Sequence, residues 1–155
     1  MKRMLFCTAA LAVAAALGWM PFHGTDVAKL EPVEVVYVTL DGREVVIETD
    51  TAASGRGADI EAAFTNMKET AAGEVFLETA DHLILSRNAE KLLPELSGYL
   101  RPACSVCIGD GEIDLEQAAA YLSVHEPVLT MTDWRAGSGA LPVLTYGEGE
   151  MRIVQ

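Results

Sequence analysis

The stretch VEVVYVTLDGREVVIETD, residues 33–50, limits the fold more than any other part of this 155-residue chain. It consists of two β-branched runs on either side of Asp41-Gly42, and an Asp-Gly pair between such runs is typical of a β-hairpin. The odd-numbered residues from Val33 to Tyr37 fall on one face of the first strand, while Val36 and Val38 make the other face apolar as well. A strand that is apolar on both faces must be covered on both sides, so we expect it to lie in a sheet that carries helices.

Three later segments carry the spacing of amphipathic helices. The first follows a small-residue loop at 51–58 and has Asp59 as its expected N-cap. Its apolar stripe comprises Ile60, Ala63, Phe64 and Met67. The second begins after Asn88, a candidate cap, and is interrupted by Pro94. The third opens with the capping box Asp114–Gln117.

Short apolar runs between these helices predict further strands. The runs are EVFLET (74–79), HLILS (82–86) and SVCIGDG (105–111). A second hairpin is expected around Gly147-Glu148-Gly149 near the end of the chain. This order of elements predicts an α/β (α+β) fold, in which about three helices pack on a mixed β-sheet. We expect residues 33–126 to form the core domain and residues 127–155 to form a tail whose hairpin joins it.

The N-terminal residues have the composition of a targeting segment. No charged side chain occurs from Met4 to Phe22, and the pair Lys2-Arg3 precedes this apolar run. A positive start, an apolar stretch and small residues such as Ala12-Val13-Ala14 are features of a secretory signal peptide. An uncleaved run of this length would also be just long enough to anchor the chain in a bilayer, and a buried helix is the remaining alternative. We expect residues 1–22 to be a signal peptide or membrane anchor, residues 23–32 to be a linker, and the rest to be exported.

Acidic side chains dominate the chain outside that segment. The whole sequence has a formal charge of −12, and two of its 11 basic side chains are Lys2 and Arg3. From residue 23 onward, 9 basic side chains therefore stand against 23 acidic ones, a net charge of −14. Such a surface repels phosphate backbones, so nucleic acid is not an expected partner.

Cys104 and Cys107 form a Cys-x-x-Cys pair in a chain that has only three cysteines. A redox pair of this spacing needs its first sulfur at a helix N-terminus, whereas this pair leads out of a helix and into a strand. Residues three apart in an extended segment also point to opposite faces. A zinc site would need two further ligands, and the sequence offers none with suitable spacing. We expect two small buried side chains, with a structural disulfide or a metal or redox pair as the alternatives.

The other polar motifs fall short of an active site. Gly55-Arg56-Gly57 precedes a helix, but acidic residues in the first turn of that helix would repel a phosphate. His82 follows Asp81 in the order of a base and its orienting group, yet no serine or cysteine near it is placed as a nucleophile. The acidic residues Glu74, Glu78 and Asp81 lack the ligand spacing of a calcium loop. We therefore expect no catalytic residue, no cofactor and no metal ion, and a protein that is not an enzyme.

The order of these motifs resembles the N-terminal domain of the Ger(x)C family, the C subunits of bacterial spore-germination receptors. The resemblance spans residues 33–155. Its motifs are the helix start GADIEAAF (57–64), the strands VFL (75–77) and DHLIL (81–85), Arg101-Pro102 leading into VCIGDG (106–111), and the pair LPVL (141–144) and MRIV (151–154). The resemblance implies an exported, mixed α/β module that is tethered to the membrane of an endospore-forming bacterium and acts through protein contacts without catalysis.

Two departures from the Ger(x)C pattern shape the expected function. Members of that family carry a lipid-modified cysteine, whereas Cys7 has almost no apolar stretch before it, and they continue through further domains. Tail strands that would pair with those domains are expected to leave an open edge here. The expected interaction strands contain Leu141, Val143, Leu144 and Ile153.

The expected partners follow from the leader and from the resemblance. They are the membrane, through residues 1–22, other envelope or germination-receptor proteins, and a second copy of the chain. The module would act on the extracytoplasmic face of the cell membrane or the spore inner membrane. The alternative function is that of a thiol/disulfide or metal-binding envelope protein that uses Cys104 and Cys107.

Overall fold

The computed structural model describes residues 30–147 and 150–154. The predicted signal peptide or anchor and residues 23–29 of the predicted linker lie outside the described residues. Within the described ranges, no helix combines the length and apolar character needed to cross a membrane. The last residues of the predicted linker form the strand β1 (Leu30–Pro32), which pairs in parallel with β5 (Glu74–Phe76) in a small separate sheet.

The predicted first hairpin is present. Strands β2 (Val35–Asp41) and β3 (Glu44–Thr49) pair antiparallel along their whole length. Gly42 in the turn between them has a φ of +64°, a conformation that glycine adopts without steric cost. Val36 points into one buried apolar cluster and Val35 into a second one, so both faces of β2 are covered as predicted. Val33, expected on the face of Val35, instead belongs to the cluster of Val36, because it precedes the start of β2.

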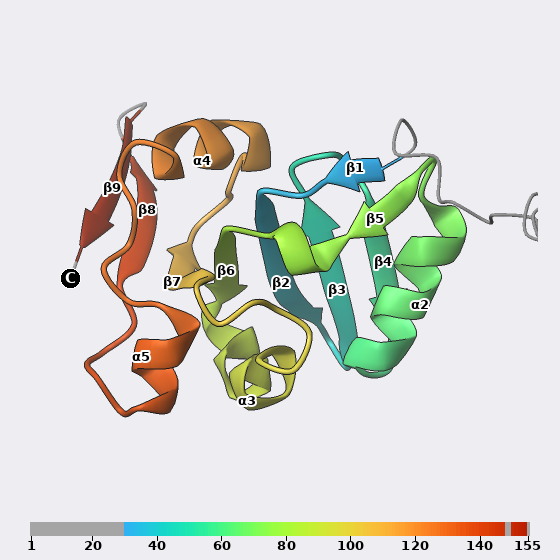
Figure 1. Cartoon of the computed structure of the whole chain (residues 1–155), viewed down its shortest axis with the longest axis horizontal. Helices are drawn as coiled ribbons and strands as arrows, with labels where there is room; N and C mark the ends of the chain where they lie inside the picture. The colour runs from blue at the N-terminus through green and yellow to red at the C-terminus, as the bar shows by residue number, and fades with distance from the viewer. Residues whose placement is uncertain (1–29, 148–149, 155) are drawn as a thin grey trace, which may run out of the picture.

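Seven strands form one mixed sheet in the order β4-β3-β2-β6-β7-β8-β9 (Figure 1). The strands not yet introduced are β4 (Ser54–Gly57), β6 (His82–Ser86), β7 (Ser105–Asp110), β8 (Val143–Gly147) and β9 (Glu150–Val154). β2, β6, β7 and β8 are parallel neighbours, whereas β3 and β4 at one side and β9 at the other pair antiparallel. The mixed sheet and the second hairpin are therefore confirmed. Parallel neighbours need crossover connections, and those connections contain the helices.

Helices cover both faces of this sheet. The first face carries α2 (Ile60–Thr70), α3 (Leu93–Leu96) and α5 (Met131–Arg135), whose buried side chains belong to one apolar cluster. The opposite face carries α4 (Leu115–Leu122), and Leu122 of this helix lies in a second cluster with Ile84 of β6. The sheet therefore separates two cores, and side chains alternate between them along each central strand.

The predicted N-caps Asp59 and Asp114 are confirmed, but the Gln117 half of the predicted capping box is not formed, because the Gln117 side-chain amide donates to Asp114 Oδ2 at 3.2 Å. Asp59 accepts the main-chain N–H of Ala62 at 2.8 Å, and Asp114 accepts that of Gln117 at 3.0 Å. All four residues of the predicted α2 stripe are buried. Local hydrogen bonding and the 3.6-residue period therefore fixed these two helices as expected.

Two predicted boundaries are wrong. Residues 54–57 of the predicted small-residue loop form the edge strand β4. The run 74–79 is a strand only as far as Phe76, because Leu77–Thr79 forms a 3-10 turn. Thr79 Oγ1 in this turn donates to the Phe76 carbonyl oxygen at 2.7 Å, which stabilises the turn in place of a longer strand.

The helix predicted after Asn88 is also different. Arg87–Leu92 is a 3-10 segment, and α3 follows it with only four residues. Asn88 does not cap a helix, because its side-chain amide donates to the carbonyl oxygen of Leu40 at 2.9 Å. Pro94 lies in the first turn of α3, where a missing N–H costs no helical hydrogen bond. The proline therefore marks a late start of the helix, which is one of the two outcomes its position allowed.

Glycines in β4 allow α2 to lie directly on this strand. A Cβ atom at Gly55 would lie 2.2 Å from the carbonyl oxygen of Ala63 and 2.6 Å from the Cβ of Met67. A Cβ atom at Gly57 would lie 2.4 Å from the main-chain nitrogen of Ala63. The two glycines of the GRG motif therefore serve helix packing, and no phosphate is needed to explain them.

The change Gly55→Ala is expected to lower the free energy of unfolding by about 1–3 kcal/mol, the usual cost of overpacking. The added methyl group would push α2 away from β4. Gly98→Ala is the matched control, because its Cβ would meet only the Glu95 carbonyl oxygen at 3.4 Å. Urea unfolding of both variants measures the difference, and equal stabilities would show that α2 does not rest on Gly55.

Candidate functional site

The outer edge of β4 is occupied by side chains of α2. The main-chain N–H of Arg56 donates to Asn66 Oδ1 at 3.0 Å, and Thr70 Oγ1 donates to the Ser54 carbonyl oxygen at 3.2 Å. Asn66 and Thr70 are four residues apart, so they lie on the same side of the helix. Helix α2 therefore closes this edge of the sheet against a further strand.

The outer side of β9, at the other edge, is open. β9 pairs antiparallel with β8 and has no second neighbour among the described strands. A two-residue connection makes Gly147 and Glu150 a hydrogen-bonded pair, and such pairs alternate along an antiparallel ladder. The main-chain N–H and C=O groups of Met151 and Ile153 therefore point away from β8. No hydrogen bond from a side chain in residues 30–147 or 150–154 reaches these groups.

Apolar and charged side chains border this open edge. Tyr146 on β8 is 46% exposed and Val154 on β9 is 56% exposed, which is high for large apolar residues. Glu150 and Arg152 form an ion pair at 3.2 Å on the same face as Val154, and their side chains are 71% and 66% exposed. Met151 points to the opposite face and packs in the cluster beneath α4. The edge thus combines free main-chain groups with side chains that a neighbouring strand could contact.

The four residues predicted to form the interaction strands have different positions. Leu144 is fully buried in the cluster beneath α4, and Leu141 and Val143 are partly buried against the opposite cluster. Only Ile153 lies on β9, the strand with the open edge. β8 is paired with β7 on one side and with β9 on the other, so its main chain is not available to a partner.

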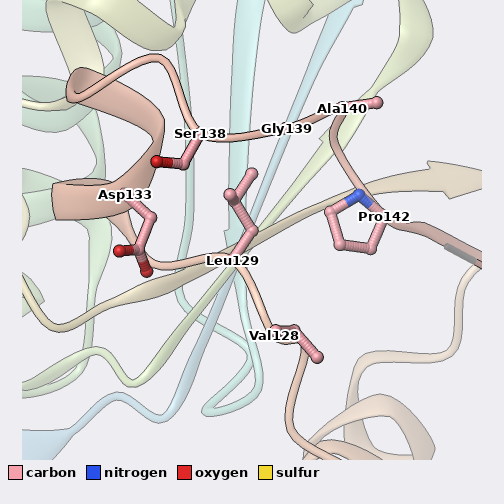
Figure 2. A pocket seen from close by; sticks show the side chains of 7 residues that line it. All are labelled: Val128, Leu129, Asp133, Ser138, Gly139, Ala140 and Pro142. Carbon is pink, nitrogen blue, oxygen red and sulfur yellow. The ribbon is translucent and has the colours of Figure 1, made fainter.

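A cavity of about 460 Å³ lies where two segments diverge from one edge of β7 (Figure 2). Val106 of β7 donates its N–H to the Leu129 carbonyl oxygen at 2.9 Å, and Ile108 donates to that of Pro142 at 2.8 Å. The lining residues are Val128, Leu129, Asp133, Ser138, Gly139, Ala140 and Pro142. Figure 2 shows Asp133 and Ser138 on one side of the cavity and Pro142 on the other.

The polar wall of this cavity serves the start of α5. Asp133 Oδ2 accepts from both the main-chain N–H and the hydroxyl of Thr130, at 3.1 and 2.6 Å. These two hydrogen bonds lower the pKa of the Asp133 carboxyl, so it is ionised at neutral pH. Thr130 in turn accepts the N–H of Asp133, which completes a capping box. The carboxylate is therefore engaged in holding the helix and does not form a catalytic pair.

Cys104 and Cys107 are free, fully buried thiols in separate parts of the core. Cys104 belongs to the cluster beneath α2, α3 and α5, and Cys107 belongs to the cluster beneath α4. The sheet lies between the two sulfurs, so neither a disulfide between them nor a shared metal ion fits this arrangement. Burial raises the pKa of each thiol to about 12, which leaves both protonated at neutral pH. Among the described residues, no group of three or more His, Cys, Asp or Glu side chains could hold a metal ion.

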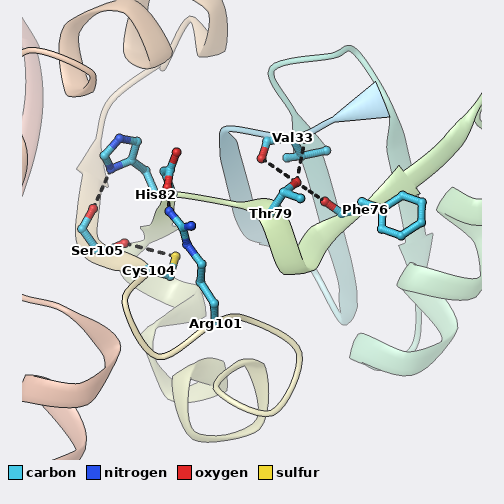
Figure 3. A network of polar contacts seen from close by, with 8 residues as sticks. Val33, Phe76, Thr79, His82, Arg101, Cys104 and Ser105 are labelled. Carbon is cyan, nitrogen blue, oxygen red and sulfur yellow. Dashed lines mark hydrogen bonds and ion pairs between the residues drawn. The ribbon is translucent and has the colours of Figure 1, made fainter. Parts of the chain in front are cut away.

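The structure places Ser105 beside His82, a contact that the sequence analysis missed. β6 and β7 are parallel neighbours, and their register sets these two residues opposite each other. His82 Nδ1 lies 2.6 Å from Ser105 Oγ (Figure 3). The two residues are only 5% and 6% exposed, which keeps a substrate away from the hydroxyl. The contact therefore satisfies two buried polar groups and is not a hydrolytic dyad.

Asp81 does not orient His82. Its carboxylate forms an ion pair with Arg101. Burial lowers the pKa of His82 below its usual 6.5, while the negative charges of Glu126 and Glu34 oppose this effect. His82 is therefore neutral in the folded protein at pH 7.

Comparison with known proteins gives no relative. No protein-family model matches the chain, and no curated protein or solved structure is significantly similar to it.

Both described thiols are expected to be unreactive in the folded protein. In a Cys7→Ser background, a thiol reagent at neutral pH should modify Cys104 and Cys107 only after denaturant unfolds the chain, because burial suppresses both access and ionisation. The measurement is the rate of reagent release with and without denaturant. Rapid modification of either thiol under native conditions would contradict this assignment.

The buried His82 is expected to make stability depend on pH. Because its pKa in the folded protein lies below the unfolded value of 6.5, its contribution is fully present above pH 6.5. As the pH falls below 6.5, the unfolded chain binds the proton first and stability is lost. Urea unfolding between about pH 7.5 and about pH 5 should show a smaller loss for His82→Gln than for the wild type.

His125→Gln is the matched control for that experiment. His125 is exposed, so this change removes a histidine without removing a buried one. The pH profile of His125→Gln should follow the wild type, and carboxylates common to all three proteins cancel in the comparison. If the His82 and His125 variants behaved alike, burial of His82 would not be the cause.

Proposed function

We propose that this protein is a non-catalytic interaction module of the cell or spore envelope, and that it binds an extended protein segment along the free edge of β9. The observation that carries the proposal is the difference between the two edges of one sheet. Side chains of α2 bond the outer main-chain groups of β4, whereas those of β9 have no such partner among the described residues. Open edges of this kind are uncommon in soluble proteins because they invite pairing.

Strand addition would supply both affinity and selectivity at this edge. The outward N–H and C=O groups of Met151 and Ile153 would form hydrogen bonds with the main chain of the added segment. Contacts between side chains of β9 and alternate side chains of that segment would determine which sequences bind. On one face the added segment would meet Glu150, Arg152 and Val154, and on the other it would approach Tyr146. A segment with apolar residues on one face and charged residues on the other suits this surface.

The buried state of the nucleophilic groups supports binding over catalysis. Cys104 and Cys107 are protonated and enclosed, and the hydroxyl of Ser105 is bonded to His82 away from solvent. Asp133, the one carboxylate in the cavity wall, caps α5. Each of these groups has a structural partner or a structural reason for its position, and an enzyme needs at least one that is exposed and poised.

The proposed location comes from the sequence outside the described residues. The apolar run from Met4 to Phe22, preceded by Lys2-Arg3, supports export and attachment to the membrane. The resemblance to the Ger(x)C N-terminal domain supports the spore or cell envelope as the place of action, with envelope or germination-receptor proteins as partners. The net charge of −12 supports a protein partner over nucleic acid.

The change Ile153→Pro is expected to abolish strand addition, because proline removes an outward N–H from β9. Ile153→Ala is the matched control, since it removes the side chain and keeps the N–H. Peptides selected on the wild-type protein from a displayed library should bind the alanine variant nearly as well. They should bind the proline variant at least about tenfold more weakly, as the loss of a main-chain hydrogen bond predicts.

Amide hydrogen exchange gives a second readout on the same peptides. Bound peptide should slow exchange at Met151 and Ile153, whereas Glu150 and Arg152, already bonded to β8, should change little. Circular dichroism would establish that both Ile153 variants are folded. Undiminished binding to the folded proline variant would remove β9 as the site.

A further inference from the structure

The open edge of β9 carries two opposite charges in a symmetric position. Glu150 and Arg152 lie on the same face of the strand, one on either side of Met151. The main-chain groups of Met151 itself point outward, away from β8. A strand with this pattern is complementary to an antiparallel copy of itself.

Symmetry limits the ways in which two β9 strands can pair. Residues that lie opposite each other in a sheet point to the same face. In a symmetric pair of β9 strands, the two-fold axis normal to the sheet must therefore pass between one residue and the same residue of the copy. Three axes overlap β9 with its copy by three residues or more, and they pass through Met151, Arg152 or Ile153. When the axis moves by one residue, each residue of β9 faces a residue of the copy that is two positions further along the strand.

Charge selects one of the three registers. An axis through Arg152 sets two guanidinium groups opposite each other, which is destabilising. An axis through Ile153 sets Arg152 opposite Val154 and gives Glu150 no partner. An axis through Met151 sets Glu150 opposite the arginine of the copy, and Arg152 opposite its glutamate. This register alone makes two cross-strand ion pairs while the two Met151 residues exchange main-chain hydrogen bonds.

We propose that the edge of β9 takes a second copy of this chain, in the register centred on Met151, so that two seven-stranded sheets become one. This inference rests on the proposed function, because it names the occupant of the same edge. The Glu150–Arg152 ion pair that each copy already holds at 3.2 Å becomes part of an alternating square of four charges. Each cross-strand pair of opposite charge favours association, whereas the net charge of −12 on each copy opposes it.

Because local ion pairs favour association and the net charge opposes it, we expect a reversible dimer. Its stability should depend on the signs of the charges at positions 150 and 152. Charge repulsion between the copies is long-ranged and is screened beyond about 8 Å at physiological salt. The cross-strand contacts are closer than this distance, so they persist where the general repulsion fades. Both side chains are more than half exposed, so changing them should leave the fold intact.

The test uses two differently tagged forms of the full chain and measures how much of one co-purifies with the other at physiological salt. Wild-type copies should capture each other. Glu150→Arg alone sets basic groups opposite basic groups, and Arg152→Glu alone sets acidic groups opposite acidic groups. Each single variant should therefore capture its own kind at least about tenfold less than wild type does, by the scale of two lost pairs.

Mixing the two single variants is the decisive step. A Glu150→Arg copy paired with an Arg152→Glu copy has opposite charges at both positions, so capture should return. The double variant Glu150→Arg/Arg152→Glu should also capture itself, because the swap restores both ion pairs. Circular dichroism of each variant would show that the losses are not caused by unfolding.

Three outcomes would overturn self-pairing. In the first, wild-type copies do not capture each other. In the second, each single variant captures its own kind as well as wild type does. In the third, mixing the two single variants does not restore capture. If wild-type copies stay apart while selected peptides still bind β9 and lose binding in Ile153→Pro, the proposed function stands and only its occupant is wrong. If the folded Ile153→Pro variant binds the selected peptides as well as wild type does, β9 is not the interaction edge.

Discussion

Burial of the central parallel strands on both faces is the constraint on which the rest of this structure depends. Between their ends, β2, β6 and β7 have little contact with solvent, because α2, α3 and α5 cover one face and α4 covers the other. A fully buried side chain there must be apolar or find a partner inside the protein. The pair His82–Ser105 is one such solution. Cys104, which directly precedes β7, and Cys107, on β7, belong to opposite clusters, as residues three apart in an extended segment should.

The same two-sided core means that free main-chain groups of the described sheet can occur only at its rims. At one rim, Gly55 and Gly57 remove the side chains that would hold α2 away, and the helix then bonds the strand edge through Asn66 and Thr70. At the other rim, β9 is held to the core by Met151 and leaves its outer main-chain groups free. One edge of the described sheet is thus covered by side chains of a helix, whereas the other edge is left open to pairing.

Several potentially reactive residues in the described part of the chain have structural roles. A thiol with a pKa of about 12, an imidazole whose proton affinity is reduced by burial, and a carboxylate that caps a short helix are all stable features of a folded core. The thiol and the imidazole are buried, and the carboxylate, which lines the cavity, is bonded to Thr130. Contact through the main chain of β9 requires no such group, which is why we propose a binding role.

The sequence by itself determined the features that depend on neighbours within a few residues. The caps at Asp59 and Asp114, the apolar stripe of α2 and the two hairpins follow from capping, from the 3.6-residue period and from turn residues. The Thr130–Asp133 capping box of α5 carried the same kind of signal and was not predicted.

Tertiary structure decided what depends on residues far apart in the chain. Ser54–Gly57 is a strand only because β3 lies beside it, and Asn88 is diverted from capping by the main chain of Leu40. The register of two parallel strands brings Ser105 to His82, and strand order alone makes β9 the outer member of the last hairpin. Local periodicity specifies which face of a strand is apolar, but it carries no information on which strand lies next to it or on which edge stays open.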